Sequence, residues 1–293
     1  MERWRVGEFT VDRVVEFQEP VFPPAALFPA STPAAIEAHR HWLEPVLMEP
    51  GTGLLVLAFH SFVVRTSRHT ILVDTCGGND KPRPQKLRYH MKNWPYLERL
   101  AAAGVSPGDI DVVLCTHLHV DHVGWNTRLR DGRWVPTFPK ARYLFGRREL
   151  AFWQEHFQRP GAAVEPHYQD SVLPILEAGQ AVLVEDDHAI EDGVTLTPTP
   201  GHTPGHLCLH LASGGRQAVM SGDLMHHALQ CAEPDWSTCF CTAPAEAAQT
   251  RRAFLERHAE TDTLIMPAHF PTPTAGRIVR AGAAWRFAFD TGT

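Results

Sequence analysis

The sequence has few cysteines, and none of them stand in CxxC pairs. Six cysteines among 293 residues are too sparse for a disulfide scaffold, so we expect reduced thiols. Cys239 and Cys241 form a C-x-C pair that could hold a metal. Two unrelated cysteines in one loop are the simpler interpretation.

Basic charge and long apolar runs are also lacking. With 27 Lys and Arg against 33 Asp and Glu, the net charge is -6, so no basic field favours nucleic acid as a partner. The longest apolar run, Leu54 to Val64, is too short for a bilayer core of roughly 30 Å, and we expect no membrane partner. The opening MERWRVGEFTVDRVV lacks the apolar stretch of a secretory signal, which predicts a cytoplasmic location unless a leader was removed.

Histidine, in contrast, is abundant. The chain has 18 histidines, whereas ordinary usage of about 2% would give roughly six. The hydrophobic share of 44% is enough to bury a sizeable core in one large α/β domain or two small ones. Metal chemistry is therefore the first function to examine.

Apolar periodicity predicts runs of strands with helices between them. No linker or internal repeat interrupts this order, so we predict a single domain over residues 1–293. The expected strands are 54–66, 69–74, 111–115, 141–145, 181–184, 194–197, 206–211, 217–220 and 263–266, and the expected helices are 94–103, 147–158 and 244–258.

The segment Glu19 to Pro50 is the exception, because its prolines and apolar residues fit neither strand alternation nor a complete helix. Two interpretations remain open. It could be an N-terminal extension packed over the core, or it could be a lid or dimer arm.

Four residues of metal-binding types occur within the string THLHVDHVGWN, directly after an expected strand. Alternation places His117 and His119 on one side, and the following turn brings Asp121 and His122 to a neighbouring point. This spacing suits two cations a few Å apart. A solvated His-rich loop would not be expected to follow a buried strand and precede a glycine.

Three more candidate ligands stand where strands are expected to end: His202, Asp223 and His269. Each is a weak signal alone, since such residues are common in turns. Together they complete a two-metal site. One ion would take His117, His119 and His202, the other would take Asp121, His122 and His269, and Asp223 could bridge both.

In these motifs the chain resembles the metallo-β-lactamase superfamily over roughly residues 54–270. The resemblance rests on Asp74, the run His117 to His122, His202, Asp223 and His269, in that order. It implies an α/β fold, an αβ/βα sandwich with a dinuclear metal site at one edge of the two sheets. Asp74 would orient the histidine loop by hydrogen bonding or merely cap a strand, and His206 matches no ligand and is expected to make a structural hydrogen bond.

The resemblance also implies a mechanism. Two divalent metal ions, with zinc as the default for these ligands, would share a water and provide a bridging hydroxide at neutral pH. Asp121 could accept and return its proton. His226 stands three residues after Asp223, where related lactonases often carry a tyrosine, and it or His227 could protonate the leaving group.

Within the superfamily the motifs look most like the lactonase and methyl parathion hydrolase-like group. This implies a small-molecule substrate, a largely uncharged ester and first of all a lactone, and leaves a homodimer possible. Open alternatives are a phosphotriesterase or arylesterase, a non-catalytic metal-dependent binding module, and an oxidoreductase with one iron. The aromatic residues that could line an apolar pocket, or simply pack the core, are Trp125, Phe138, Trp153, Trp236, Phe240 and Phe270.

Overall fold

The computed structural model describes residues 2–158 and 166–290. The chain forms two compact units, each built from two separate segments. Unit 1 contains Met1–Phe17 and Phe59–His188, and unit 2 contains Gln18–Ala58 and Ala189–Thr293. Because Phe17 and Phe59 lie inside strands and not in linkers, composition does not mark the division. The single domain expected over 1–293 stays a prediction.

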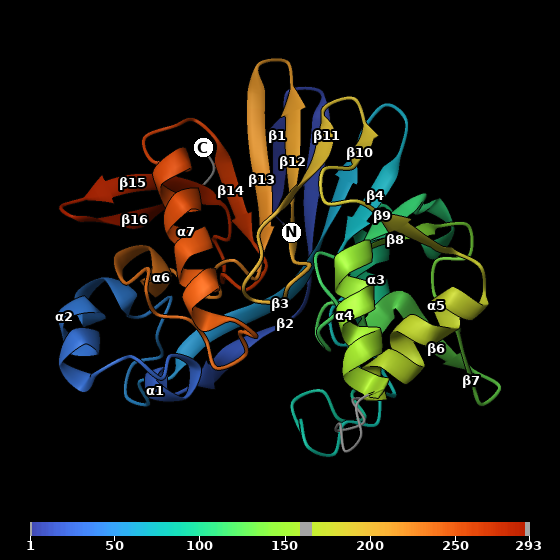
Figure 1. Ribbon diagram of the computed structural model, residues 1–293, viewed down its shortest axis with the longest axis horizontal. Helices are drawn as coiled ribbons and strands as arrows, with labels where there is room; N and C mark the ends of the chain where they lie inside the picture. Colours follow the sequence, from blue (N-terminus) through green and yellow to red (C-terminus); the bar gives the residue numbers. More distant parts are fainter. Residues whose placement is uncertain (1, 159–165, 291–293) are drawn as a thin grey trace. The chain divides into compact units, whose positions relative to one another are not determined.

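Unit 1 carries most of a seven-stranded sheet with the order β1-β2-β3-β4-β5-β8-β9 (Figure 1). The expected hairpin is confirmed as an antiparallel pair of β3 and β4, and β4, β5, β8 and β9 run parallel. Parallel strands bring their carboxyl ends to the same edge of a sheet, where sites are commonly built. The bounds are β1 (Arg3–Val6), β2 (Phe9–Phe22), β3 (Leu55–Arg65), β4 (Thr70–Val73), β5 (Val112–Leu114), β8 (Arg142–Gly146) and β9 (Ala181–Val184).

Three helices of unit 1 share a core with this sheet: α3 (Tyr96–Ala102), α4 (Arg147–Gln158) and α5 (Leu173–Glu177). Buried Leu100, Trp153 and Ile175 contribute one side chain from each helix. Helices were expected at α3 and α4 and are confirmed. The smaller elements are the hairpin β6 (Thr127–Arg130) and β7 (Arg133–Pro136), the 3₁₀ turns η1 (Pro107–Asp109) and η2 (Gly124–Asn126), and the π-helical turn η3 (Tyr168–Val172).

Unit 2 is built on a second seven-stranded sheet, whose order β10 to β16 follows the chain (Figure 1). Its one parallel pair is β13 with β14, and Gly222 lies opposite Pro267 at the carboxyl ends of both strands. Asp223 and His269 follow these ends, so the topology brings them together. The bounds are β10 (Ala189–Glu191), β11 (Val194–Pro198), β12 (Leu207–Ser213), β13 (Arg216–Gly222), β14 (Leu264–Pro267), β15 (Gly276–Ala281), β16 (Ala284–Phe289), α6 (Leu229–Ala232) and α7 (Pro244–His258).

The segment Glu19 to Pro50 is more regular than the sequence predicted. It contains the end of β2, the short helix α1 (Pro24–Leu27) and the complete helix α2 (Pro33–Leu43), so the expectation of no complete helix is wrong. Thr32 caps α2 by accepting a hydrogen bond from the backbone N–H of Ala35 at 3.2 Å. The buried side chains Leu27, Phe28, Leu43, Leu47 and Met48 pack the segment into unit 2. A role as lid or dimer arm stays a prediction.

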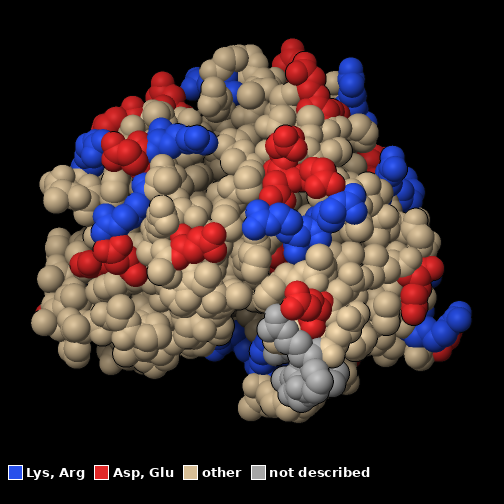
Figure 2. All heavy atoms as spheres, in the orientation of Figure 1, with Lys and Arg blue, Asp and Glu red and all other residues tan. Residues whose placement is uncertain are grey.

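The surface charges are mixed on the face drawn in Figure 2. Small groups of Lys and Arg alternate there with small groups of Asp and Glu, as a net charge of -6 with both signs well represented would give. No helix in the described ranges has the length and apolar character needed to cross a membrane.

Candidate metal centre

The HLHVDH segment follows β5, and Asp74 fixes both its ends. One carboxylate oxygen of Asp74 accepts a hydrogen bond from the backbone N–H of Thr116 at 2.8 Å, and the other lies 2.9 Å from Nδ1 of His122. Asp74 itself has a φ of 58°, a conformation in which aspartate is enriched. Of the two roles expected for Asp74, the structure shows orientation of the loop by hydrogen bonding.

His117 and His119 turn their rings toward each other. Nε2 of His117 lies 3.0 Å from Nδ1 of His119, while Nδ1 of His117 lies 3.1 Å from the hydroxyl of Thr116. Glu149 of α4 holds the intervening residue, because it accepts a hydrogen bond from the backbone N–H of Leu118 at 2.9 Å. The two imidazoles are therefore directed at a common point.

Asp121 and His122 form a second pair of candidate ligands in unit 1. Oδ1 of Asp121 lies 4.0 Å from Nε2 of His122, which is too far for a hydrogen bond and suits a shared cation. Since Nδ1 of His122 faces Asp74, Nε2 is the nitrogen that faces Asp121. The other oxygen, Oδ2, accepts a hydrogen bond from the hydroxyl of Tyr89 at 3.0 Å.

The loops that carry Asp74 and the histidines lie in direct contact. A Cβ at Gly124 would lie only 2.0 Å from the backbone of Gly77, so only glycine fits there. Buried Glu16 of β2 joins both loops, since it accepts hydrogen bonds from the N–H groups of Gly77, Gly78 and Trp125. Burial raises the pKa of Glu16 to about 7, against the opposing effect of these donors.

In unit 2, three imidazoles converge on the carboxylate of Asp223. Nε2 of His269 lies 3.0 Å from Oδ1, and the Nε2 atoms of His202 and His226 lie 3.2 and 3.1 Å from Oδ2. Asp223, His226 and His269 each offer a ligand atom within 4.8 Å of the others. The structure thus brings His226, predicted only as a proton donor, into the same cluster as three of the predicted ligands.

Neighbouring groups orient these imidazoles through Nδ1. Nδ1 of His269 lies 3.0 Å from the carbonyl oxygen of Ala58, and Nδ1 of His202 lies 3.6 Å from Sγ of Cys241. The backbone N–H of Thr242 donates to the carbonyl of His202 at 2.8 Å, which ties the Cys241 loop to the ligand loop. Contacts of this kind fix which nitrogen faces a metal.

Two other histidines of unit 2 have structural roles. His206 accepts a hydrogen bond from the backbone N–H of Asp223 at 2.9 Å, and its Nδ1 lies 2.7 Å from the hydroxyl of Thr199, which confirms the expected structural hydrogen bonding. Nε2 of His227 lies 2.9 Å from the carbonyl of Leu47, and its Nδ1 accepts from the N–H of Leu229. Both nitrogens of His227 are engaged, so it is a poor candidate for the proton donor.

The chemistry of the Asp223 cluster fits a divalent cation. Burial lowers the pKa of His202, but the charge of Asp223 more than offsets this and raises it to about 9. Burial also lowers the pKa of His226, to about 4, and here Asp223 does not compensate. The carboxylate of Asp223 therefore holds a proton on His202 that a divalent ion would displace, and imidazoles with a carboxylate are ligands that Zn²⁺ prefers.

The six aromatic residues expected near a pocket have different surroundings. Trp153 places its ring 5.5 Å from that of His119. Phe240 is 45% exposed, and its ring centre lies 6.4 Å from that of His226, so it offers an apolar surface beside the Asp223 cluster. The remaining four are buried: Trp125, Phe138, Trp236 and Phe270.

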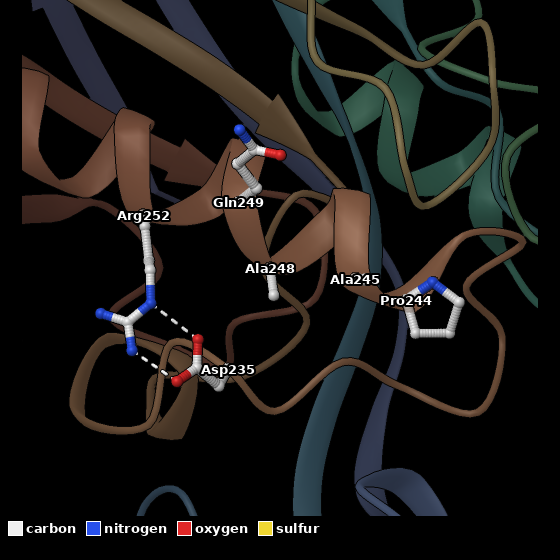
Figure 3. Close-up of a pocket in the computed structure, with 6 residues that line it drawn as sticks. All are labelled: Asp235, Pro244, Ala245, Ala248, Gln249 and Arg252. Carbon is white, nitrogen blue, oxygen red and sulfur yellow. Dashed lines mark hydrogen bonds and ion pairs between the residues drawn. The ribbon is translucent and has the colours of Figure 1, made fainter.

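A surface hollow of unit 2 lies on the first turns of α7 (Figure 3). Its two charged residues pair with each other, Arg252 Nε donating to Asp235 Oδ1 at 2.6 Å. No predicted site residue lines this hollow, which is formed by Asp235, Pro244, Ala245, Ala248, Gln249 and Arg252. We therefore do not assign it to the metal centre.

Sequence reasoning missed the residues that orient the ligands from elsewhere in the chain. Tyr89 and Glu149 contact Asp121 and the backbone of the histidine loop, but they lie in stretches without a recognisable motif. Cys241 belongs to the C-x-C pair, which does not by itself indicate its contact with His202. Cys239 and Cys241 were interpreted as two unrelated loop cysteines, and the structure adds the contact between Cys241 and His202. Only contacts made in the folded chain identify these three residues.

A family model described as the metallo-beta-lactamase superfamily matches residues 57–277, and the chain belongs to this superfamily. The predicted α/β fold with two large sheets is thereby confirmed. A solved hydrolase of the beta-lactamase superfamily, AbOPH, superposes with a TM-score of 0.80 at 22% identity, covering 99% of this chain and 97% of that one. The dizinc quorum-quenching lactonase AidC, solved with its product N-hexanoyl-L-homoserine, gives a TM-score of 0.79 at 19% identity over 100% and 98% of the two chains.

Sequence relatives cover shorter stretches. An N-acyl homoserine lactonase from Bacillus sp. is 31% identical over 110 residues, which are 38% of this chain and 36% of the relative. A probable metallo-hydrolase of Mycobacterium bovis is 26% identical over 185 residues, 59% of this chain and 58% of the relative. The chain thus aligns with about a third to three fifths of these relatives, and the solved structures, at such low identity, establish the fold alone.

Proposed function

We propose that the protein is a metal-dependent hydrolase of a small, largely uncharged ester, with a lactone as the first substrate to test. The observation that carries this proposal is the orientation of the imidazoles. In unit 2, Nδ1 of His202 and His269 contacts a protein group, while Nε2 of each faces Asp223. A structural histidine such as His206 instead uses both nitrogens within the protein.

The proposed ligands are the seven that the sequence motifs indicate. His117, His119 and His202 would hold one ion, Asp121, His122 and His269 the other, and Asp223 would be shared. Two divalent ions bound there, zinc by default, would lower the pKa of a shared water from about 15.7 toward neutrality and so supply hydroxide. Asp121 would accept and return the proton of that water, with its position set by Tyr89.

His226 is the proposed contact for the substrate's leaving oxygen. Its Nε2 lies 3.1 Å from Oδ2 of Asp223, and its Nδ1 has no hydrogen-bond partner among the described residues. The exposed ring of Phe240 lies beside it, and Phe22 packs against Phe240 with ring centres 5.7 Å apart. An imidazole next to apolar rings suits a neutral ester with an acyl or alkyl group.

A substrate panel with a metal count tests this function directly. The chain, purified with excess zinc, would be analysed by mass spectrometry and assayed on lactones, aryl esters and phosphotriesters. We expect two ions per chain and fastest turnover on a lactone, abolished by a chelator and by Asp223→Ala. Turnover that survives both treatments, or two bound ions without hydrolysis of any of the three classes, would contradict the proposal.

A further inference from the structure

Tyr89 makes a contact that no motif assigns. Its hydroxyl donates a hydrogen bond to Oδ2 of Asp121 at 3.0 Å, while Oδ1 of the same carboxylate lies 4.0 Å from Nε2 of His122. The two oxygens of Asp121 therefore have different neighbours. Since a phenol is protonated near neutral pH, Tyr89 is the donor in this bond.

We propose that Tyr89 is a positioning residue for Asp121. By holding Oδ2, its hydroxyl directs Oδ1 toward His122, so that this oxygen and Nε2 of His122 serve one metal ion together. The inference rests on the proposed function, in which Asp121 is a ligand. A hydrogen bond to the second oxygen of a carboxylate keeps it from rotating or binding through both oxygens, and such outer contacts tune metal affinity.

The loop that carries Tyr89 is held firmly enough for this role. Two backbone hydrogen bonds join the ends of the loop. The N–H of Asp80 donates to the carbonyl of Lys92 at 3.0 Å, and the N–H of Met91 donates to the carbonyl of Lys81 at 2.8 Å. Near Tyr89, the backbone N–H of Arg83 donates to Nδ1 of His90 at 2.9 Å. The segment from Asp80 to Lys92 is thus a closed loop with internal bonds.

A buried ion cluster anchors the same loop to η3. Arg83 donates two hydrogen bonds to Asp170, at 2.6 and 2.8 Å, and Nζ of Lys81 lies 3.5 Å from Asp170 Oδ1. Lys81 and Arg83 are both almost fully buried. Buried pairs of this kind fix geometry, because a displaced charge loses its partner without gaining water.

Packing alone does not account for the tyrosine. Its ring lies edge-on to Phe59 with centres 5.8 Å apart and 6.3 Å from Phe17. A phenylalanine would make the same ring contacts. The hydroxyl group is therefore the part of Tyr89 that the proposal concerns, and Tyr89→Phe removes it alone.

The test compares Tyr89→Phe with Tyr96→Phe, which removes a buried hydroxyl of the same unit that bonds Ser61 and no candidate ligand. Stepwise zinc dissociation constants of each full-length variant would be measured by chelator competition, and visible spectra would be recorded for the cobalt forms. We expect Tyr89→Phe to weaken one of the two constants by about 10-fold, within the 10- to 100-fold range of such contacts. We expect its cobalt spectrum to change, and Tyr96→Phe to resemble the wild type.

The possible outcomes test the role of Tyr89 separately from the proposed hydrolase function. Unchanged constants and spectrum in Tyr89→Phe would overturn it, and so would lost turnover with both readouts intact, because the hydroxyl would then act on substrate. A wild type that binds only one ion, insensitive to Tyr89→Phe, would also overturn it. A wild type that binds two ions but hydrolyses nothing would refute the hydrolase alone, and the metal constants would still report on Tyr89.

Discussion

Histidines close together in the sequence serve different purposes in this protein, and the difference lies in what each ring nitrogen contacts. His202 and His206 share one loop, yet His206 bonds Thr199 through Nδ1 and the backbone N–H of Asp223 through Nε2. His202 uses Nδ1 toward Cys241 and turns Nε2 to the Asp223 carboxylate. One imidazole thus holds the backbone of a proposed ligand, and the other is itself a proposed ligand.

Replacing each of these two histidines by alanine should affect different properties, metal content for His202 and stability for His206. We expect His202→Ala to lose metal and to reduce turnover by at least about 100-fold, since a direct ligand should cost no less than an outer contact. His206→Ala should still load with metal in excess zinc, but should lose about 1–3 kcal/mol of stability because the N–H of Asp223 loses its acceptor. Metal content and denaturant unfolding measure the two effects, and equal loss of metal in both variants would show that His206 is a ligand.

His226→Phe tests the proposed hydrogen bond to the substrate's leaving oxygen. The phenyl ring keeps the volume but cannot hydrogen-bond, so turnover on alkyl lactones should fall by about 10²- to 10⁴-fold. Aryl esters, whose leaving group needs no proton, should lose much less. The comparison is valid only with the metal content unchanged, which mass spectrometry checks. Equal losses on both substrates would contradict a role for His226 at the leaving oxygen.

At the scale of elements, the sequence predicted many strands and helices from apolar periodicity but missed β15 and β16, although buried and more exposed residues alternate there. The hairpin of β3 and β4 and helix α7 lie where expected. β2 was missed because buried charged residues, among them Asp12 and Glu16, break its apolar pattern. These charges are tolerated since Arg3 and Arg65 pair with Asp12, and three N–H groups bond Glu16. No local sequence pattern indicates these partners of Asp12 and Glu16.

Prediction of the site residues has the same limit, because a sequence pattern shows only what is local. The proposed ligands could be predicted because each follows a strand or lies in a dense histidine motif, and a short stretch of sequence is enough to show this. Tyr89 is separated from Asp121 by 32 positions and Cys241 from His202 by 39. Such contacts depend on how loops pack after folding, and a single sequence gives no signal for them.

Asp170→Asn should loosen the loop that carries Tyr89. Burial raises the pKa of Asp170, but Arg83 and Lys81 outweigh this and lower it below its usual value. The pKa of Asp170 is lower in the folded than in the unfolded protein. Its ion pairs therefore stabilise the fold fully at pH values above the unfolded pKa, and this stabilisation is lost as the pH falls through the folded pKa. We expect the variant to lose about 3–5 kcal/mol at pH 7 and to show a smaller acid-induced loss below pH 4 than the wild type.

Urea unfolding of both proteins at several pH values measures this difference. Asp186→Asn provides a control, since Asp186 pairs with the exposed Arg148 at 3.0 Å and such pairs contribute little. A parallel pH dependence in Asp170→Asn and the wild type would exclude the cluster as the source of acid sensitivity.

At the scale of the whole molecule, candidate ligands are distributed over both units: four lie in Phe59–His188 and three in Ala189–Thr293. Neither unit carries the full set that the motifs indicate. If all seven residues bind metal as proposed, binding would depend on native structure in both units, and the unfolded chain should bind far more weakly.

Removal of metal should accordingly lower thermal stability. At a free zinc concentration 1,000-fold above the dissociation constant, binding adds about 4 kcal/mol to the folded state, which corresponds to roughly 10 °C in Tm for a protein of this size. Calorimetry with zinc and with a chelator would measure the shift. The Tm of Asp223→Ala should differ little between the two conditions. A wild-type Tm that does not change with zinc would contradict the proposed metal ligands.

The discontinuous make-up of the units also affects how the chain is produced. On the ribosome, Gln18–Ala58 emerges early, with Leu27, Phe28 and Leu43 destined for the interior of unit 2. The remainder of that unit begins only at Ala189. At about 5–20 residues per second, translation of the intervening stretch takes on the order of ten seconds. During that time the nascent chain exposes aggregation-prone apolar side chains. We therefore expect the yield of folded protein in a heterologous host to depend on holdase chaperones and on slow expression at low temperature.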